Sequence, residues 1–248
     1  MCLVALFYRV VEDAPVVVGA NREEAFARGG EPPRLLDGPV RCVAGVDPAA
    51  GGTWLGVNER GVLVAATNRP KSQLPPRPRS RGLLARDLLA CPSAAAAADL
   101  AAREVGAGRY AGCNFLCADR HSAIVVYGGD WLRVRPLPPG LHVLTNGDAN
   151  DATDRRTAHA LAWLGRRGCA CADDCLAALR ELCAQGGEGG PAICYRQGGH
   201  GTVSSTLTAL RLALADSTLL HAQGPPDRTP YEDLSGLLRQ LFTPRPGA

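Results

Sequence analysis

Short apolar runs, many rich in β-branched residues, alternate with turn-forming residues over the first 70 positions of the chain. Residues 3–10 (LVALFYRV) and 15–20 (PVVVGA) predict two strands, and the short polar turn between them predicts a hairpin. Further strand-like runs lie at 41–46, 54–57 and 61–67, separated by turns that contain glycine. The pattern indicates antiparallel strands joined by hairpins.

The rest of the chain mixes helical and strand-like segments. Residues 70–80 contain four prolines and predict an irregular loop, after which Ser93 can cap a helix over 93–105. Further helices are expected at 154–165 and 173–185, with Asp154 and Asp173 as caps, and near 230–241. Further strands are expected at 113–117, 122–127, 131–135, 141–145, 203–213 and 216–221. Antiparallel sheets covered by helices make the fold class α+β, a layered sandwich.

We expect one domain over residues 1–248, with 230–248 as a C-terminal helix and tail, because no linker divides the chain. The net charge is +3 and the arginines are scattered among acidic residues, which argues against a nucleic-acid partner. No apolar run approaches the roughly 20 residues of a membrane span, and the start does not resemble a secretory signal. A cytoplasmic location is therefore expected, with most of the ten cysteines as buried thiols.

Cys2 is the first candidate for chemistry. Initiator methionine is normally removed before a small residue, so the mature chain would begin with a cysteine that carries both a thiol and a free α-amine. An α-amine titrates near ~7.7–8.0 and can take the proton from its own nucleophile at neutral pH. Taken alone, a cysteine at position 2 is more often a small buried strand residue.

Three polar residues near strand ends extend this candidate site. Arg22 follows the second predicted strand and could favour the thiolate of a nearby cysteine. Asn68 and Asn146 each end an apolar strand, where an amide could donate to a developing oxyanion or orient the α-amine. Each also has a plainer interpretation, as a surface charge or a turn-capping amide.

The combined motifs resemble the NRDE family, which includes the eukaryotic transport and Golgi organization proteins. The matching segments cover residues 1–148 well and the remainder weakly. They are MCLV at 1–4, ANREE at 20–24, AGVDPAAGGTWLGVNERG at 44–61, TNRP at 67–70, SRG at 80–82 and VLTNGD at 143–148.

A more distant resemblance is to the cholylglycine hydrolase and penicillin V acylase group of N-terminal nucleophile (Ntn) hydrolases. It implies an αββα sandwich and hydrolysis of a linear amide, or acyl transfer from it, with catalytic residues at Cys2, Arg22, Asn68 and Asn146. We assign substrate-binding positions to Glu23, Trp54, Arg69 and His200. His200 lies in the glycine-rich segment GGHGT, which predicts a flexible turn, and it could line a pocket or ligate heme. The expected partner is a small amide or acyl compound, with no cofactor required.

Two departures leave a second function open. The family's aspartate is Glu23 here, and Val203 stands where the resemblance leads us to expect an arginine, which weakens the case for efficient catalysis. The alternative is a non-catalytic carrier of heme or acyl-CoA in the same fold. Cys169, Cys171 and Cys175 lack the spacing of a zinc site, so we expect structural thiols and no metal.

Overall fold

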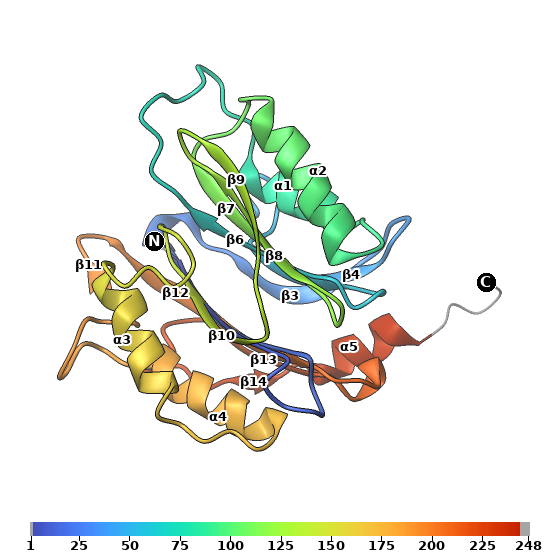
Figure 1. Cartoon of the computed structure of the whole chain (residues 1–248), viewed down its shortest axis with the longest axis vertical. Coiled ribbons are helices and arrows are strands. Elements are labelled where there is room, and N and C mark those ends of the chain that lie inside the picture. The colour runs from blue at the N-terminus through green and yellow to red at the C-terminus, as the bar shows by residue number, and fades with distance from the viewer. Residues whose placement is uncertain (1, 244–248) are drawn as a thin grey trace.

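The computed structural model describes residues 2–243, which contain two antiparallel sheets of seven strands each (Figure 1). The first sheet has the order β10-β1-β2-β12-β13-β14, with β11 paired to β12. Its strands are β1 Leu3–Tyr8, β2 Val16–Ala25, β10 Gly140–Leu144, β11 Arg196–Gln197, β12 His200–Leu210, β13 Thr218–Ala222 and β14 Glu232–Asp233.

The second sheet runs in chain order from β3 to β9. Every neighbouring pair is antiparallel, as the hairpin pattern predicts. Its strands are β3 Glu31–Leu36, β4 Cys42–Val46, β5 Leu55–Asn58, β6 Leu63–Asn68, β7 Cys113–Ala118, β8 Ala123–Gly128 and β9 Leu132–Pro136.

Helices cover the outer face of each sheet, so the layers follow the order α, β, β, α (Figure 1). Helices α1 (Arg81–Leu88) and α2 (Ala94–Gly106) pack on the second sheet, and α3 (Arg155–Leu164) and α4 (Ala172–Cys183) pack on the first. Helix α5 (Ser235–Phe242) contributes Leu238 and Leu241 to the core between the sheets. The expected αββα sandwich is confirmed.

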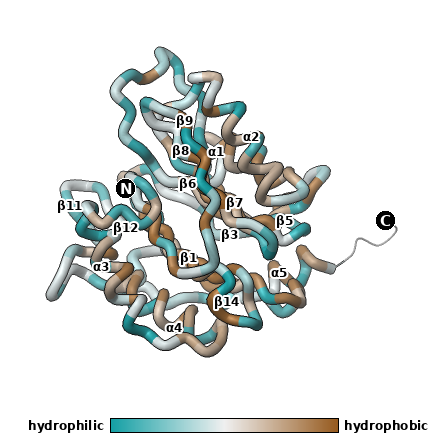
Figure 2. Tube along the Cα trace, viewed as in Figure 1, coloured by the Kyte–Doolittle hydropathy of each residue, from teal (hydrophilic) through white to brown (hydrophobic). Residues whose placement is uncertain are grey.

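Strand β1 is apolar at every position because both of its faces are buried. Val4, Leu6 and Tyr8 face the core between the two sheets, whereas its odd-numbered residues pack against α3 and α4. Because both faces of the strand are buried, side chains of alternating direction must all be apolar. Figure 2 shows the hydrophobic residues gathered along the strands and the hydrophilic ones along the outer loops.

Most predicted elements are confirmed within a few residues, including the capping of α2 by Ser93 and of α3 by Asp154. Among the α-helices and strands, four were missed: strand β3, helix α1 and the two-residue strands β11 and β14. Strand β3 contains two prolines, which are tolerated because it lies at a sheet edge, and α1 begins directly after the Pro-rich loop. The predicted cap Asp173 is wrong, since Cys171 and Asp174 form the capping box of α4.

The segment 21–24 was expected to follow the second strand, but it lies within β2, where it pairs with β12. A strand flanked on both sides can bury polar residues when other elements supply their partners, and β2 does so near its end. Helix α5 confirms part of the predicted C-terminal helix, and residues 244–248 of the expected tail lie outside the described residues. Within residues 2–243, no helix is long and apolar enough to cross a membrane.

Candidate active site

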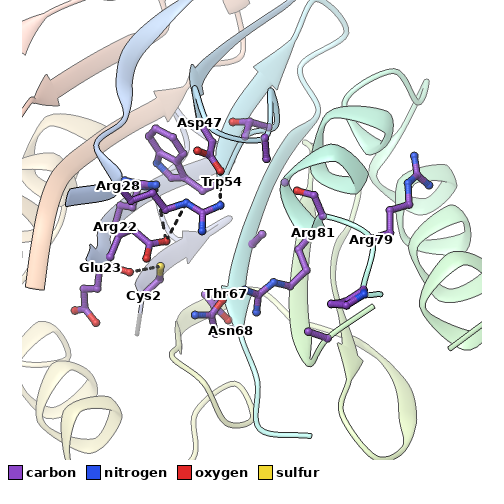
Figure 3. Close-up of a pocket in the computed structure, with 18 residues that line it drawn as sticks. Cys2, Arg22, Glu23, Arg28, Asp47, Trp54, Thr67, Asn68, Arg79 and Arg81 are labelled. Atoms are coloured by element: carbon purple, nitrogen blue, oxygen red, sulfur yellow. Dashed lines mark hydrogen bonds and ion pairs between the residues drawn. The ribbon is translucent and has the colours of Figure 1, made fainter. Parts of the chain in front are cut away.

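A cavity of about 350 Å³ opens at one end of the sandwich, where the start of β1, the ends of β2 and β6, and the start of α1 meet (Figure 3). Strands β1 and β2 are antiparallel neighbours, so Cys2 and the polar residues at 22–24 necessarily reach the same end of their sheet. Strand β6 brings Thr67 and Asn68 from the other sheet. The cavity therefore lies between the two sheets.

Cys2 lines this cavity and is partly buried. Its Sγ lies 4.0 Å from the backbone oxygen of Glu23, which accepts a weak hydrogen bond from the thiol. Burial raises the pKa of the Cys2 thiol, and the nearby Arg22 charge opposes that rise only in part. A raised pKa makes the thiolate harder to form, so a nearby base would help the thiol to become a nucleophile.

Arg22 is held by the ring of Trp54 and by the backbone of Gly29. Its guanidinium carbon lies 4.3 Å from the Trp54 ring centroid, and Nη1 donates to the Gly29 oxygen at 2.7 Å. A Cβ on Gly45 would lie 2.5 Å from the Trp54 ring, so only glycine leaves room for the indole there. Burial lowers the pKa of Arg22, while the Glu24 carboxylate opposes this.

Glu23 forms a buried ion pair with Arg156 of α3. Both carboxylate oxygens accept from the guanidinium, one of them from Nη1 at 3.1 Å, and the side chain of Glu23 is fully buried. Arg156 also donates to the Ile193 oxygen at 3.0 Å. Burial raises the pKa of Glu23, and the hydrogen bonds and charge of Arg156 work against that rise. The pair ties α3 to the strand that carries the site.

The wall opposite Cys2 is the first turn of α1, and a glycine contact fixes its position. The Thr53 amide donates to the Gly82 oxygen at 3.0 Å, and a Cβ on Gly52 would overlap the Gly82 backbone. Ser80 caps the helix by accepting from the Leu83 amide. The GGTW and SRG segments of the sequence thus pack directly against each other through their backbones.

Acidic residues pair with Arg28 at the rim of the cavity. Arg28 Nη2 donates to Asp47 Oδ2 at 2.7 Å, and its Nε lies 3.7 Å from Glu24. Burial would raise the pKa of Asp47, but the Arg28 hydrogen bond and charge outweigh it, and the pKa lies below its usual value. Asp47 also accepts from the Ala49 amide at 3.1 Å, which stabilises the turn after β4.

The structure brings together five of the eight residues expected from the sequence. Cys2, Arg22, Glu23, Trp54 and Asn68 all line the cavity. The remaining three, Asn146, Arg69 and His200, are absent from the lining that the described residues form.

Each of the three lies nearby in another setting. Asn146 follows β10 with its Oδ1 buried and without a hydrogen-bond partner among residues 2–243. Arg69 pairs with Asp148 at 2.9 Å. His200 was expected in a flexible turn, but it begins β12, and its Nδ1 lies 2.9 Å from the Tyr195 hydroxyl.

Sequence reasoning missed several residues that build the site. Asn114 is fully buried in β7 and donates to Thr67 Oγ1 and to the oxygens of Thr145 and Gly147, so it joins the two sheets at the cavity. Arg156 lies in a segment without a motif, and only the tertiary fold shows its role. Asp47 lies within the segment 44–61 and Arg81 within the segment 80–82, so the resemblance to the NRDE family could have identified both residues.

Other candidates fall outside the cavity. Val203 sits at a bulge of β12 and lines a separate hollow with Arg22. Among residues 2–243, no group of three or more His, Cys, Asp and Glu side chains is arranged to hold a metal ion. Cys175 is buried and burial raises its pKa, as expected for a structural thiol.

Comparison with known proteins adds the family and the fold. The model of the family "Transport and Golgi organisation 2" matches residues 1–166. The human "Transport and Golgi organization protein 2 homolog" is 30% identical over 139 residues, which cover 53% of this chain and 50% of that protein. This chain therefore spans about half the length of the curated relative that it matches.

Three solved structures share the fold at low sequence identity. They are a Caenorhabditis elegans ortholog of N-acylethanolamine-hydrolyzing acid amidase (14% identity, 83% of this chain and 92% of that one, TM-score 0.57), penicillin V acylase from Agrobacterium tumefaciens (11%, 96% and 88%, 0.55) and a mutant conjugated bile acid hydrolase from Clostridium perfringens (12%, 96% and 94%, 0.53). Sequence identities this low support a shared fold and nothing further.

Proposed function

Because the chain belongs to the Transport and Golgi organisation 2 family and has the fold of Ntn hydrolases, we propose that it is an amidohydrolase or acyltransferase whose nucleophile is Cys2. The observation that carries the proposal is the placement of Cys2, which lines the cavity between the sheets beside Arg22 and across from the start of α1. The names of the three structural neighbours describe an acid amidase, an acylase and a hydrolase of conjugated bile acids, which supports the same reaction class.

The reaction begins once Met1 has been removed. The α-amine of Cys2 accepts the thiol proton, and the thiolate attacks the amide carbonyl carbon to form a tetrahedral oxyanion. Collapse breaks the C–N bond, and the proton held by the α-amine passes to the departing amine. Water, or an acceptor amine in a transferase, then attacks the thioester and releases the acyl group from Cys2.

The raised pKa of the Cys2 thiol fits this scheme. A thiol whose pKa is raised depends more strongly on an adjacent base, and the α-amine supplies one at neutral pH. Arg22 stabilises the thiolate as it forms, because it is a buried cation that opposes the rise in the Cys2 pKa.

Asn68 is our first candidate donor for the oxyanion, since it ends β6 at the cavity. Asn146 is a weaker candidate, because its side chain is not part of the cavity lining among the described residues. Loss of one oxyanion donor typically costs about 10²–10³ in kcat. An Asn68→Ala variant should therefore be much more impaired than Asn146→Ala.

Carriage of acyl-CoA or heme remains the second candidate, and the cavity suits heme poorly. No histidine lines it among the described residues, and His200, the ligand considered from the sequence, is bonded to Tyr195 instead. The raised pKa of Cys2 also disfavours a thiolate ligand. An acyl carrier would need the cavity but not the nucleophile.

The test offers the purified protein a panel of acyl p-nitroanilides and p-nitrophenyl esters, with intact mass spectrometry after acid quenching. We expect release of the chromophore and an acyl adduct on Cys2, both abolished in Cys2→Ala and retained in Cys91→Ser, which alters another partly exposed thiol. Binding of acyl compounds with equal affinity to wild type and Cys2→Ala, without turnover or adduct, would favour the carrier.

A further inference from the structure

Arg81 differs from the other cations of the cavity wall. It is the first residue of α1, partly buried, and its Nη1 donates to the Gly112 oxygen at 2.9 Å. No acidic residue occupies the first turn of α1, and no carboxylate pairs with Arg81 among residues 2–243. A guanidinium has five N–H donors, and Arg81 lines the cavity, so it keeps further donors for a ligand there.

The three other arginines of the wall already have acidic partners. Arg28 pairs with Asp47 at 2.7 Å, and Arg22 lies 3.9 Å from Glu24 and stacks on Trp54. Arg79 turns away from the cavity (Figure 3). It pairs with Asp87 of α1 at 2.7 Å and with Glu104 of α2 at 3.2 Å. The unmatched positive charge of the wall is therefore that of Arg81.

Arg81 also faces the reacting group. Figure 3 shows its side chain extending from α1 toward Thr67 and Asn68, while Cys2 lies on the opposite side of these residues. A ligand that fills the cavity would thus have one end at the thiol and the other at the guanidinium. The volume of about 350 Å³ is at the low end of ligand pockets, which limits that ligand to a small molecule.

We propose that Arg81 determines specificity by binding a carboxylate of the substrate, so that the enzyme acts on small amides that carry this anionic group at the end remote from the scissile bond. The inference rests on the proposed function of Cys2. Arginine suits the role because its planar fork matches both carboxylate oxygens, and such charge-assisted pairs are stronger than neutral hydrogen bonds.

The backbone around Arg81 supports a fixed recognition site. The contact between Gly52 and Gly82 and the bond from Thr53 to Gly82 hold the first turn of α1 rigidly against the loop after β4. A guanidinium mounted on such a turn loses little freedom when a carboxylate binds. Within the SRG segment, the glycine would then set the position of the helix and the arginine would bind the ligand.

The test compares matched alkylating probes at Cys2: bromoacetylated ω-amino acids of increasing length, and the same compounds as neutral carboxamides. The thiolate displaces bromide, so a C–S bond forms as the C–Br bond breaks, and peptide mass spectrometry assigns the adduct. At one chain length we expect the acid to alkylate Cys2 at least tenfold faster than its carboxamide, and Arg81→Gln to remove roughly that factor. Arg81→Lys should restore only part of it.

Arg86→Gln is the matched control, because it removes the same charge from the same helix outside the cavity lining. Equal rates for acids and carboxamides at every length, or an acid preference that survives Arg81→Gln, would overturn the proposal. A second measurement separates it from the nucleophile hypothesis: calorimetry of the unreactive N-acetyl ω-amino acids with Cys2→Ala. Binding there that needs both the carboxylate and Arg81 supports the anion site even if Cys2 proves unreactive, and absence of such binding refutes it.

Discussion

The buried pair between Glu23 and Arg156 gives the sharpest prediction about stability. The two side chains are 0% and 13% exposed, and the pair joins α3 to the strand that carries the candidate site. Arg156→Met keeps an unbranched apolar stem, although the side chain is shorter and has no guanidinium. It removes two hydrogen bonds to Glu23 and one to the Ile193 oxygen. The Glu23 carboxylate then stays buried without its guanidinium.

The size of the effect follows from this burial. Removing one partner of a buried ion pair typically costs about 3–5 kcal/mol. Because Arg156 retains some exposure, we expect about 3 kcal/mol, or a fall in Tm of roughly 6–12 °C for a chain of this length. Arg167→Met is the matched control, since it breaks a pair with Glu181 whose side chains are 45% and 57% exposed. That change should cost less than about 1 kcal/mol.

The loss should also depend on pH in a definite direction. Burial already holds the folded-state pKa of Glu23 above its ordinary value, and removing Arg156 takes away the charge that opposes this. A group with a raised folded pKa stabilises the protein below its unfolded pKa, and this contribution is lost as pH rises through the folded pKa. The penalty of Arg156→Met should therefore be smallest in acid and grow as Glu23 ionises.

Urea denaturation of the wild type, Arg156→Met, Glu23→Gln and the double variant between about pH 4.5 and pH 8 measures these quantities. The double variant should recover much of the loss, because the charge and its partner are then both absent. A penalty below about 1 kcal/mol at pH 8, or one that increases toward acid, would refute the reasoning.

Three further changes have defined outcomes. Gly52→Ala should destabilise the fold by about 1–3 kcal/mol in urea denaturation, because its Cβ would overlap the Gly82 backbone, and any gain in stability would contradict that packing. Arg22→Met should slow alkylation of Cys2 by iodoacetamide roughly tenfold at pH 7, since the buried cation opposes the rise in the thiol pKa; an unchanged rate would mean that the charge does not act on Cys2. Burial lowers the pKa of His221, so stability that is complete above its unfolded pKa of ~6.5 should be lost as pH falls below it, and His221→Gln should flatten this slope in denaturation curves.

The layered fold was accessible from the sequence because its strands are nearly all apolar and separated by clear turn residues. The run LVALFY at 3–8 is an example, since burial on both faces demands it. Helix α1 was not predicted because it begins directly after the Pro-rich loop and is only eight residues long. Strand β3 was not predicted because its two prolines argue against a strand, and only its position at a sheet edge permits them.

The site was predictable where its motifs lie at or near the ends of strands. Cys2 and Asn68 were found in this way, because antiparallel strands bring their ends together at the cavity. Arg156 could not be found, since nothing local distinguishes it from the neighbouring Arg155 and only packing brings it to Glu23. His200 was misjudged for a related reason: glycines suggested a mobile turn, but pairing with β2 makes the residue part of β12.

The central claim is that Cys2 is the nucleophile at a mature N-terminus, and intact mass spectrometry tests it most directly. The protein is treated briefly at pH 7 with a limiting amount of a thioester acyl donor, alongside Cys2→Ala. The account predicts that Met1 is absent and that one acyl group is added per chain, located on Cys2 and missing from the variant. Retention of Met1, or acylation spread over the other partly exposed thiols with Cys2 no faster than Cys91, would contradict it.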